Sequence, residues 1–407
     1  MTHFVNIPEV YFFMIPSIAH IGGGEFYVAR KVQYLRSLGV EVYVISTQKM
    51  EIKIPELKEF SSYIWEEMTF PISITPLRVI NVIEKRFGRL LKDRKNAIIE
   101  SNMVTLSPWA EYIASIYNIK HVVYLLTETF KTISPSLKSF FYFKLGQHLL
   151  YGITKYSIAY LLKTSDDLSY TELVAVGNIS NQVKEIPLPI EVNKNNYDYV
   201  VICLGRLSKN YVMAATAAVC NFSKHTNLRV KLILVGGDAS AREINNLKAI
   251  IDTSKNVDGE FTGALSPIPL GLFEIADVAI SGAGCALICS QNGVPTITVD
   301  ANDNKAIGIL NVTTNNTTFR TVEPPIDIES LLDDVLIKKM YRVNKKKEEN
   351  DDYSQHMKVM SITTKGDYYD INTLENERKY KLLKIIYHYS SFRFVRSIMN
   401  IYIAFVK

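Results

Sequence analysis

Short hydrophobic runs, each followed by a polar or glycine-rich turn and then by a helical pattern, recur along the chain. In the second half, residues 200–204, 230–235 and 278–280 are continuously apolar, which predicts strands buried on both faces of a sheet. The alanine-rich residues 213–222 predict a helix after the first of these strands. Strands that alternate with helices in this way predict a doubly wound parallel sheet.

The first half of the chain repeats this pattern. Residues 10–15 form an apolar run, and Gly39 ends a predicted helix whose apolar face holds Phe26, Ala29, Val32, Leu35 and Leu38. Residues 41–46, 97–101 and 121–126 predict further buried strands of the same sheet. The chain is therefore expected to hold two α/β, Rossmann-like domains.

Three turns at the ends of predicted strands carry the candidate chemistry of the second half. Glycines there let backbone amides approach phosphate oxygens, which a side chain would hold away. The turn at 281–284 leads into a helix predicted over 285–292, and the free N–H groups of this turn and the positive end of the helix favour a diphosphate. Arg206 and Lys209 add positive charge from the first turn. The alternative is that these glycines only close tight strand–helix connections.

The order and spacing of these motifs resemble the GT-B fold glycosyltransferases, most closely the family 4, group 1 type of bacterial surface (capsular and exo-) polysaccharide biosynthesis. The similarity lies in Gly205-Arg206-Leu207 with Lys209, and in residues 234–237, 261–263, 276–278 and 293–297. The resemblance implies a set of donor-binding residues: Arg206, Lys209, Gly236, Gly237, Phe261, Gly263, Ser281, Gly282, Ala283 and Gly284.

The resemblance also implies an architecture of two Rossmann-like domains that face each other across a cleft. Residues 1–190 are expected to bind the acceptor and residues 191–325 the donor, while residues 326–407 form a linker and a basic, amphipathic helical tail. Residues 186–191 resemble the proline-containing hinge of the family, in which proline restricts the backbone between the domains.

The activity that the resemblance implies is a metal-independent, hexosyltransferase-type transfer. A sugar moves from a nucleoside-diphosphate sugar, with no cofactor besides this donor, to a hydroxyl of a polyprenyl-linked glycan. The leaving diphosphate gains negative charge as the bond breaks. Arg206, Lys209 and the turn at 281–284 are therefore expected to matter most in the transition state.

One departure from the family pattern concerns its two glutamates separated by seven residues, which this chain lacks. Ser281 or Ile280 stands where the first would fall, and Ile288 stands at the second, which accepts hydrogen bonds from the ribose. An isoleucine cannot accept them. Three alternatives stay open: the role is taken over by Gln291, Asn292 or Ser290, the donor is bound mainly through its diphosphate, or activity has been lost. Whether the reaction retains or inverts the stereochemistry also stays open.

The acceptor side is expected to involve His20 and the loop of Gly22, Gly23 and Gly24, where the backbone can approach the transferred sugar. An inverting reaction requires a base in this domain. Glu128, after the strand at 121–126, is the first candidate, and Glu25 is the second. The alternative is that none of the three takes part in the reaction. Glu128 would then be a surface carboxylate, Glu25 an acid that interacts favourably with the helix dipole, and His20 a polar surface residue.

Length and composition fit a two-domain globular protein, since 407 residues with 47% apolar and 21% charged residues can bury two cores. No apolar run is long enough to cross a membrane and no signal-peptide pattern opens the chain, so a cytoplasmic protein is expected. The cysteines are interpreted as buried free thiols: Cys203, Cys220, Cys285 and Cys289. No metal site is expected, and Asp300 and Asp303 are interpreted as turn residues.

Basic charge gathers at the C-terminus, because residues 378–407 contain seven of the 46 basic residues and no acidic residue. Their pattern predicts two short amphipathic helices with a break at Ser390-Ser391. Such a tail fits peripheral binding to an anionic membrane at the inner face of the cell, or packing back on the N-terminal domain, or both. Nucleic-acid binding is not expected, because the rest of the chain is not basic.

Two other classes of function stay open. A nucleotide-sugar epimerase or hydrolase would use the same C-terminal turns, but would not be expected to carry a membrane-seeking tail. A non-catalytic GT-B partner subunit of another glycosyltransferase would keep the fold without the ribose carboxylate. Arg206→Ala and Lys209→Ala should leave the function of such a subunit intact, whereas a transferase would lose most of its activity with either change.

Overall fold

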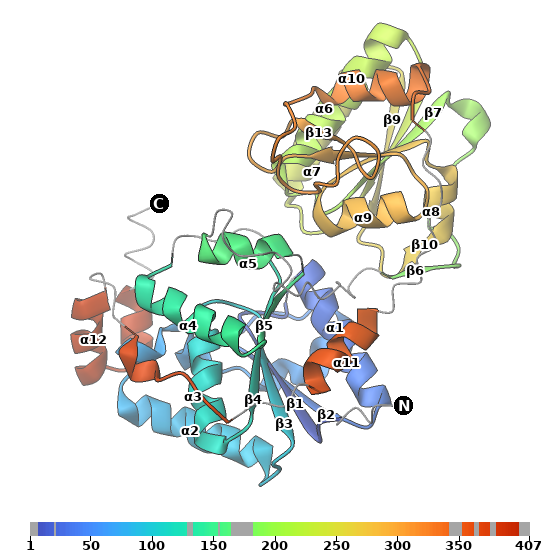
Figure 1. Ribbon diagram of the computed structural model, residues 1–407. Helices are drawn as coiled ribbons and strands as arrows, with labels where there is room; N and C mark the ends of the chain where they lie inside the picture. The colour runs from blue at the N-terminus through green and yellow to red at the C-terminus, as the bar shows by residue number, and fades with distance from the viewer. Residues whose placement is uncertain are drawn as a thin grey trace. The chain divides into compact units, whose positions relative to one another are not determined.

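The computed structural model describes residues 7–19, 22–127, 133–153, 155–163, 182–341, 352–361, 366–374 and 380–398 (Figure 1). The chain divides into two compact units. Unit 1 comprises Met1–Ser180 and Asp351–Lys407, and unit 2 comprises Asn181–Asn350. The chain returns to unit 1 later than the predicted boundary at 325, because Ile328, Leu331 and Leu332 belong to the core of unit 2.

Unit 1 is built on a five-stranded parallel sheet in the order β2-β1-β3-β4-β5. The strands are β1 (Val10–Ile15), β2 (Glu41–Ser46), β3 (Ala97–Ser101), β4 (Lys120–Leu125) and β5 (Leu150–Gly152). Almost every strand residue is buried, as expected for a parallel sheet covered by helices on both faces.

Helices cover both faces of this sheet. One face packs against α1 (Gly23–Ser37) and the 3-10 helix η1 (Pro55–Ser62). The other face packs against α2 (Leu77–Leu91), α3 (Ser107–Tyr117), α4 (Pro135–Gly146) and α5 (Lys155–Leu162), with the 3-10 helices η2 (Glu66–Thr69) and η3 (Ile72–Ile74) beside them. In α2 the buried positions Ile80, Ile83, Phe87 and Leu91 recur at helical spacing, which gives this helix one apolar face.

The C-terminal segment of the chain packs on unit 1. Its elements are α11 (Asp352–Ser361), η6 (Ile371–Thr373), α12 (Tyr380–Tyr389) and a helical stretch at 392–398. Val359 and Met360 of α11 enter the core beneath α1, and Ile371 enters the core beneath α3. The predicted break at Ser390-Ser391 is confirmed, since α12 ends just before it and the next helix begins just after it.

Unit 2 holds a six-stranded sheet in the order β13-β12-β11-β7-β8-β9. The strands are β7 (Tyr199–Leu204), β8 (Val230–Val235), β9 (Val257–Gly263), β11 (Val278–Ser281), β12 (Thr296–Val299) and β13 (Ala306–Ile309). All neighbours are parallel except β13, which runs antiparallel at the edge beside β12. A separate parallel pair joins β6 (Val183–Lys184) to β10 (Ile268–Pro269).

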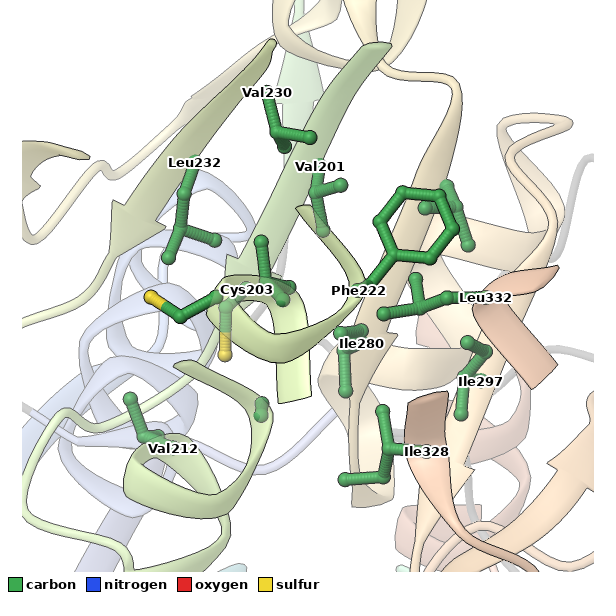
Figure 2. Close-up of a cluster of buried hydrophobic side chains, with 14 of the residues drawn as sticks. Val201, Cys203, Val212, Phe222, Val230, Leu232, Ile280, Ile297, Ile328 and Leu332 are labelled. Carbon is green, nitrogen blue, oxygen red and sulfur yellow. The ribbon is translucent and has the colours of Figure 1, made fainter. Parts of the chain in front are cut away.

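Helices again cover both faces of the unit 2 sheet. The core on one face lies under α6 (Asn210–Thr226), α7 (Ala241–Ile251) and α10 (Ile328–Leu332), and Figure 2 shows Val201, Cys203 and Phe222 within it. The opposite face packs against α8 (Leu270–Ile275) and α9 (Ala283–Gln291). The short elements η4 (Lys194–Asn196) and the π-helical η5 (Asp333–Ile337) complete the unit. The predicted fold class, α/β with two Rossmann-like domains, is confirmed.

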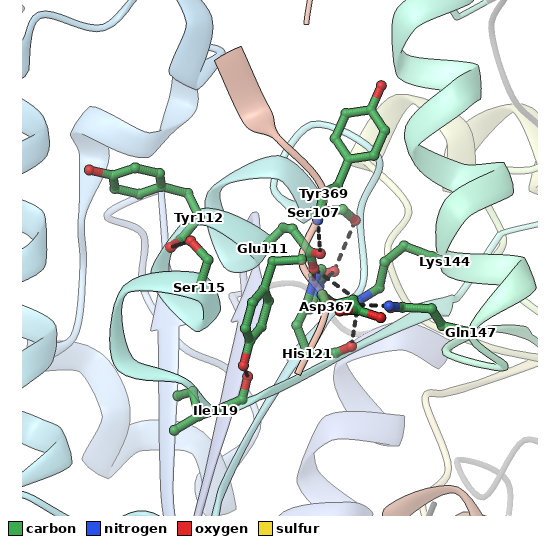
Figure 3. A network of polar contacts seen from close by, with 12 residues as sticks. Ser107, Glu111, Tyr112, Ser115, Ile119, His121, Lys144, Gln147, Asp367 and Tyr369 are labelled. Carbon is green, nitrogen blue, oxygen red and sulfur yellow. Dashed lines mark hydrogen bonds and ion pairs between the residues drawn. The ribbon is translucent and has the colours of Figure 1, made fainter. Parts of the chain in front are cut away.

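A buried polar network lies on the α3 side of the unit 1 sheet (Figure 3). His121 Nδ1 lies 2.6 Å from Glu111 Oε2, and His121 Nε2 lies 2.9 Å from Ser101 Oγ. Lys144 Nζ donates to the same Glu111 oxygen at 2.9 Å, and the backbone N–H of Tyr369 donates to the other oxygen. Glu111 thereby ties the C-terminal segment to the sheet.

Ser101, His121 and Glu111 have the connectivity of a hydrolase triad, but all three are sealed in the protein. Their exposed fractions are 0%, 1% and 0%, so a substrate has no access to the serine oxygen. Although burial raises the pKa of Glu111, hydrogen bonds and attraction from His121 and Lys144 lower it to about 2. We assign the network a structural role.

Acid is expected to destabilise unit 1 through His121. Burial, with the nearby charge of Lys144, lowers the pKa of His121 from 6.5 to about 4. Between these values the unfolded chain binds a proton that the folded protein does not bind, so the free energy of unfolding falls as the pH drops, by about 3 kcal/mol in all. Urea denaturation across this window should show a shallower loss for His121→Gln than for the wild type. His148→Gln, at an exposed histidine, is the control, and equal pH slopes in all three proteins would contradict the assignment.

Candidate functional site

The candidate site lies at the carboxyl edge of the unit 2 sheet, between β7 and β11. The strand order reverses there, because β8 and β9 follow on one side of β7 while β11 and β12 lie on the other. Open α/β sheets bind ligands just outside the carboxyl ends of the strands at such a reversal. Leu204 and Ser281, the last residues of the two strands, pair in register, so the turns that follow begin side by side.

The turn after β7 requires glycine at position 205. Its φ is +150°, and a Cβ there would lie 2.2 Å from the hydroxyl oxygen of Tyr211. This hydroxyl donates to the carbonyl of Leu204 at 3.1 Å, which fixes α6 against the end of β7. Arg206 and Lys209 follow Gly205 in this turn. The Arg206 side chain is 53% exposed, and Lys209 directly precedes α6.

Gly236, in the turn after β8, is in direct contact with the Gly205 turn. A Cβ at position 236 would lie 1.7 Å from the carbonyl oxygen of Gly205. The N–H of Gly205 donates to Val235, that of Gly236 donates to Gly263, and that of Leu207 donates to Gly237. Three of the predicted donor-site turns are therefore joined by backbone hydrogen bonds at one edge of the sheet.

The turn at 281–284 differs from its prediction in two respects. The helix α9 starts at Ala283, two residues earlier than expected, and Ala283 has a φ of +54°, a region that alanine rarely occupies. The backbone N–H of Ala283 is not free, because it donates to the carbonyl of Thr317 at 2.8 Å. Ser281 is fully buried and its hydroxyl donates to Leu204 at 2.6 Å, so this side chain joins two turns.

Positive charge gathers at the start of α9. Burial raises the pKa of Cys285, in the first turn of this helix, and the positive charges of Lys209 and Arg206 oppose that rise. Both side chains therefore act on the N-terminal end of α9, where the helix dipole is also positive. Arg206 lies 3.8 Å from a carboxylate oxygen of Asp238, a partly exposed pair that contributes little to stability.

Ile288, at the position where the resemblance implies a ribose-binding carboxylate, is a residue of the hydrophobic core. Ile288 is 8% exposed and packs with the cluster beneath α8 and α9. Ser290 is buried and its hydroxyl accepts from Asn311, while Asn292 donates to the carbonyl of Ile288 at the end of α9. Gln291 is exposed at the same helix end. All three suggested replacements lie at the end of α9 away from the 281–284 turn.

Phe261 and Gly263 belong to β9, the edge strand of the sheet. Phe261 packs partly against the core, and Lys248 of α7 lies 5.9 Å from its ring centre. Gly263 is exposed with a φ of +72°, a conformation that favours glycine. One side of the Phe261 ring is thus used in packing.

In unit 1, the glycine loop leads directly into α1. Gly22 precedes the helix, and Gly23 and Gly24 are its first residues. A Cβ on Gly22 would lie 2.8 Å from a carboxylate oxygen of Glu25, so this carboxylate lies over the start of the helix, where the dipole favours a negative charge. His20 and Glu128 lie outside the described residues.

Known proteins resemble this chain in structure only. No protein-family model matches the chain, and no curated protein matches it in sequence. A glycosyltransferase from Rickettsia africae superimposes with a TM-score of 0.54 at 18% identity, over 87% of this chain and 96% of that one. The two proteins share a fold.

Two further solved structures superimpose with lower TM-scores. HepE of Anabaena, in complex with UDP-glucose, has a TM-score of 0.47 at 13% identity and covers 87% of this chain and 93% of its own. A putative UDP-N-acetylglucosamine 2-epimerase from Listeria monocytogenes also has a TM-score of 0.47 at 13% identity, over 94% of this chain and 97% of its own.

Sequence reasoning missed the loop that follows β13. Besides the bond from Ala283 to Thr317, the N–H of Ala301 donates to Thr318, so the loop lies beside the start of α9. Arg320 lies 3.7 Å from Asp300 and ion-pairs with Asp303, and its buried Nη1 has no hydrogen-bond partner among the described residues. A lone arginine far from any glycine motif gives no sequence signal. The prediction that Asp300 and Asp303 form a turn is confirmed, since both accept backbone N–H groups two residues on.

The described residues offer no cluster of three or more histidine, cysteine or acidic side chains suited to a metal ion. The four cysteines are free thiols; Cys203, Cys220 and Cys289 are buried, and Cys285 is partly exposed. Within the same described part of the chain, no helix has the length and apolar character that crossing a bilayer requires.

Proposed function

We propose that this protein is a glycosyltransferase that moves a hexose from a nucleoside-diphosphate sugar to a hydroxyl of a polyprenyl-linked glycan in bacterial surface polysaccharide synthesis. The observation that carries the proposal is that the turn with Arg206 and Lys209 begins beside the turn that starts α9, since Ser281 pairs in register with Leu204 and donates to its carbonyl at 2.6 Å. The fold shared with the Rickettsia glycosyltransferase supports it.

The chemistry follows from the charge at this edge. As the bond between the sugar and the diphosphate breaks, the leaving group gains negative charge. Arg206 and Lys209 stabilise that charge together with the α9 dipole, which lets the reaction proceed without a metal. The donor's diphosphate is bound here, and its ribose is held without the carboxylate that Ile288 replaces.

The acceptor is bound by unit 1, in the neighbourhood of the loop from Gly22 to Gly24. Glu25 and Glu128 are the proposed candidates for the base in an inverting reaction. Because the acceptor is anchored in a membrane, the protein works at the cytoplasmic face of that membrane as a peripheral protein.

The test is a transfer assay with purified protein, a panel of nucleoside-diphosphate sugars and polyprenyl-linked acceptor lipid. The expected result is release of one nucleoside diphosphate and a labelled lipid product, both lost in Lys209→Ala. Lys224→Ala is the matched control, because Lys224 is an exposed lysine near the other end of α6. A sugar altered or released without any acceptor would instead identify an epimerase or a hydrolase.

A second candidate function is a non-catalytic subunit that binds another transferase. Two observations favour it: Ile288 is buried where a ribose carboxylate is expected, and the Ala283 N–H is already bonded to Thr317. Such a subunit would keep its effect on its partner transferase when Arg206 and Lys209 are both replaced by alanine, whereas the enzyme would lose its activity.

A further inference from the structure

The α12 helix is held on unit 1 by one of its faces. Leu383 and Tyr387 are buried against Phe70 and Ile74, and Val395 of the next helix joins the same cluster. Arg78 donates to the backbone carbonyl of Tyr387 at 2.9 Å and to that of Ser390, at the end of α12. The orientation of the helix is thereby fixed.

The opposite face of the same segment is apolar and exposed. Leu382, Ile385 and Tyr389 are 67%, 59% and 83% exposed, and Phe394 of the next helix is 55% exposed. The first three recur at spacings of three and four residues, so they form one stripe on α12. Contiguous large apolar groups on a surface mark a site of interaction, whereas scattered ones do not.

Positive charge flanks this stripe. Lys384 and Arg393 are exposed, and residues 378–407 include no acidic residue. Two carboxylates beside this segment are already paired, Glu66 with Arg396 of the same segment and Glu67 with Arg86 of α2. An apolar stripe with basic flanks is the composition of a helix that lies in the interface of an anionic bilayer.

We propose that Leu382, Ile385, Tyr389 and Phe394, with Lys384 and Arg393 beside them, form a docking surface for an anionic lipid bilayer. A second copy of the chain is the less favourable occupant, because a symmetric contact would bring the same basic residues together. The role of this docking rests on the proposed function, because docking would bring the enzyme to its lipid-linked acceptor. Membrane binding itself does not depend on the donor site.

The test is co-sedimentation of the full-length protein with vesicles of phosphatidylcholine, with and without phosphatidylglycerol. The wild type should bind the anionic vesicles, and Leu382→Glu with Ile385→Glu should lower the partition coefficient by about tenfold or more. Lys384→Glu with Arg393→Glu should lower it and reduce its dependence on salt. Ile116→Glu, at a 52% exposed residue of α3, is the matched control and should bind as the wild type does.

Circular dichroism and the thermal midpoint of each variant check that the fold is kept, which is expected because Leu382, Lys384 and Ile385 of α12 and Arg393 of the next helix are all exposed. Equal vesicle binding by the wild type and the folded double variants would overturn the proposal, as would absence of wild-type binding. A concentration-dependent dimer that the same substitutions dissociate, without vesicle binding, would overturn it in favour of a second copy. Vesicle binding and sugar transfer are measured in separate assays, so failure of docking and failure of the proposed enzymatic function are distinguishable.

Discussion

Gly236→Ala is expected to destabilise unit 2 by about 3 kcal/mol and to abolish nucleotide binding. The added methyl group would lie 1.7 Å from the carbonyl oxygen of Gly205 and 2.8 Å from its carbonyl carbon. Both atoms belong to backbone, which cannot rotate aside as a flexible side chain would. The turns after β7 and β8 must therefore move apart, and Arg206 moves with the first of them.

The comparison for this variant is Gly271→Ala in α8 of the same unit. Apart from the local backbone, no atom of the described residues lies within 4 Å of the position of its added Cβ, and alanine favours a helix more than glycine does. Urea denaturation should show a stability equal to or above that of the wild type for Gly271→Ala and a large loss for Gly236→Ala. A Gly236→Ala protein as stable as the wild type would contradict the observed contact between the two turns.

Glu100→Gln is expected to cost about 3 to 5 kcal/mol of unit 1 stability, because it leaves a buried lysine without its counter-charge. Lys31 Nζ lies 2.5 Å from Glu100 Oε2 with side-chain exposures of 4% and 1%. Burial alone would raise the pKa of Glu100, but Lys31 and hydrogen bonds from Tyr11 and Asn102 lower it below its usual value. The glutamate is therefore ionised at neutral pH.

This network also anchors α11 to unit 1, since His356 Nδ1 of that helix lies 3.2 Å from Lys31 Nζ. Removing both charges in Lys31→Met with Glu100→Gln should recover most of the lost stability, because no lone buried charge remains. Glu59→Gln, which breaks the half-exposed pair with Arg36, should cost less than about 1 kcal/mol. Equal losses for Glu59→Gln and Glu100→Gln in urea denaturation would contradict this account.

Much of the fold could be predicted from the sequence, because a strand buried on both faces is a continuous apolar run. The strands at 10–15, 41–46, 97–101 and 230–235 match their predicted bounds residue for residue. Helix ends were less accurate. The helix predicted over 213–222 covers Asn210–Thr226, and the polar residues 223–226 at its C-terminal end carry no apolar period.

The candidate site was only partly predictable. Glycine motifs placed the turns of unit 2 correctly at one sheet edge, because strand ends converge in a parallel sheet. The bond from Ala283 to Thr317 and the position of Arg320 depend on the path of a loop, which has no period and no motif. The sequence also could not predict which face of α12 packs on Phe70, since that helix is apolar on more than one side.

Our claim that unit 2 binds the diphosphate of a nucleotide sugar can be tested by a thermal-shift panel with uridine, guanosine, thymidine and cytidine diphosphates. We predict that one of them raises the thermal midpoint of the wild type, and that Arg206→Ala and Lys209→Ala each lose that shift while Lys224→Ala keeps it. No shift with any of the four, or a shift that both substitutions leave intact, would contradict the claim.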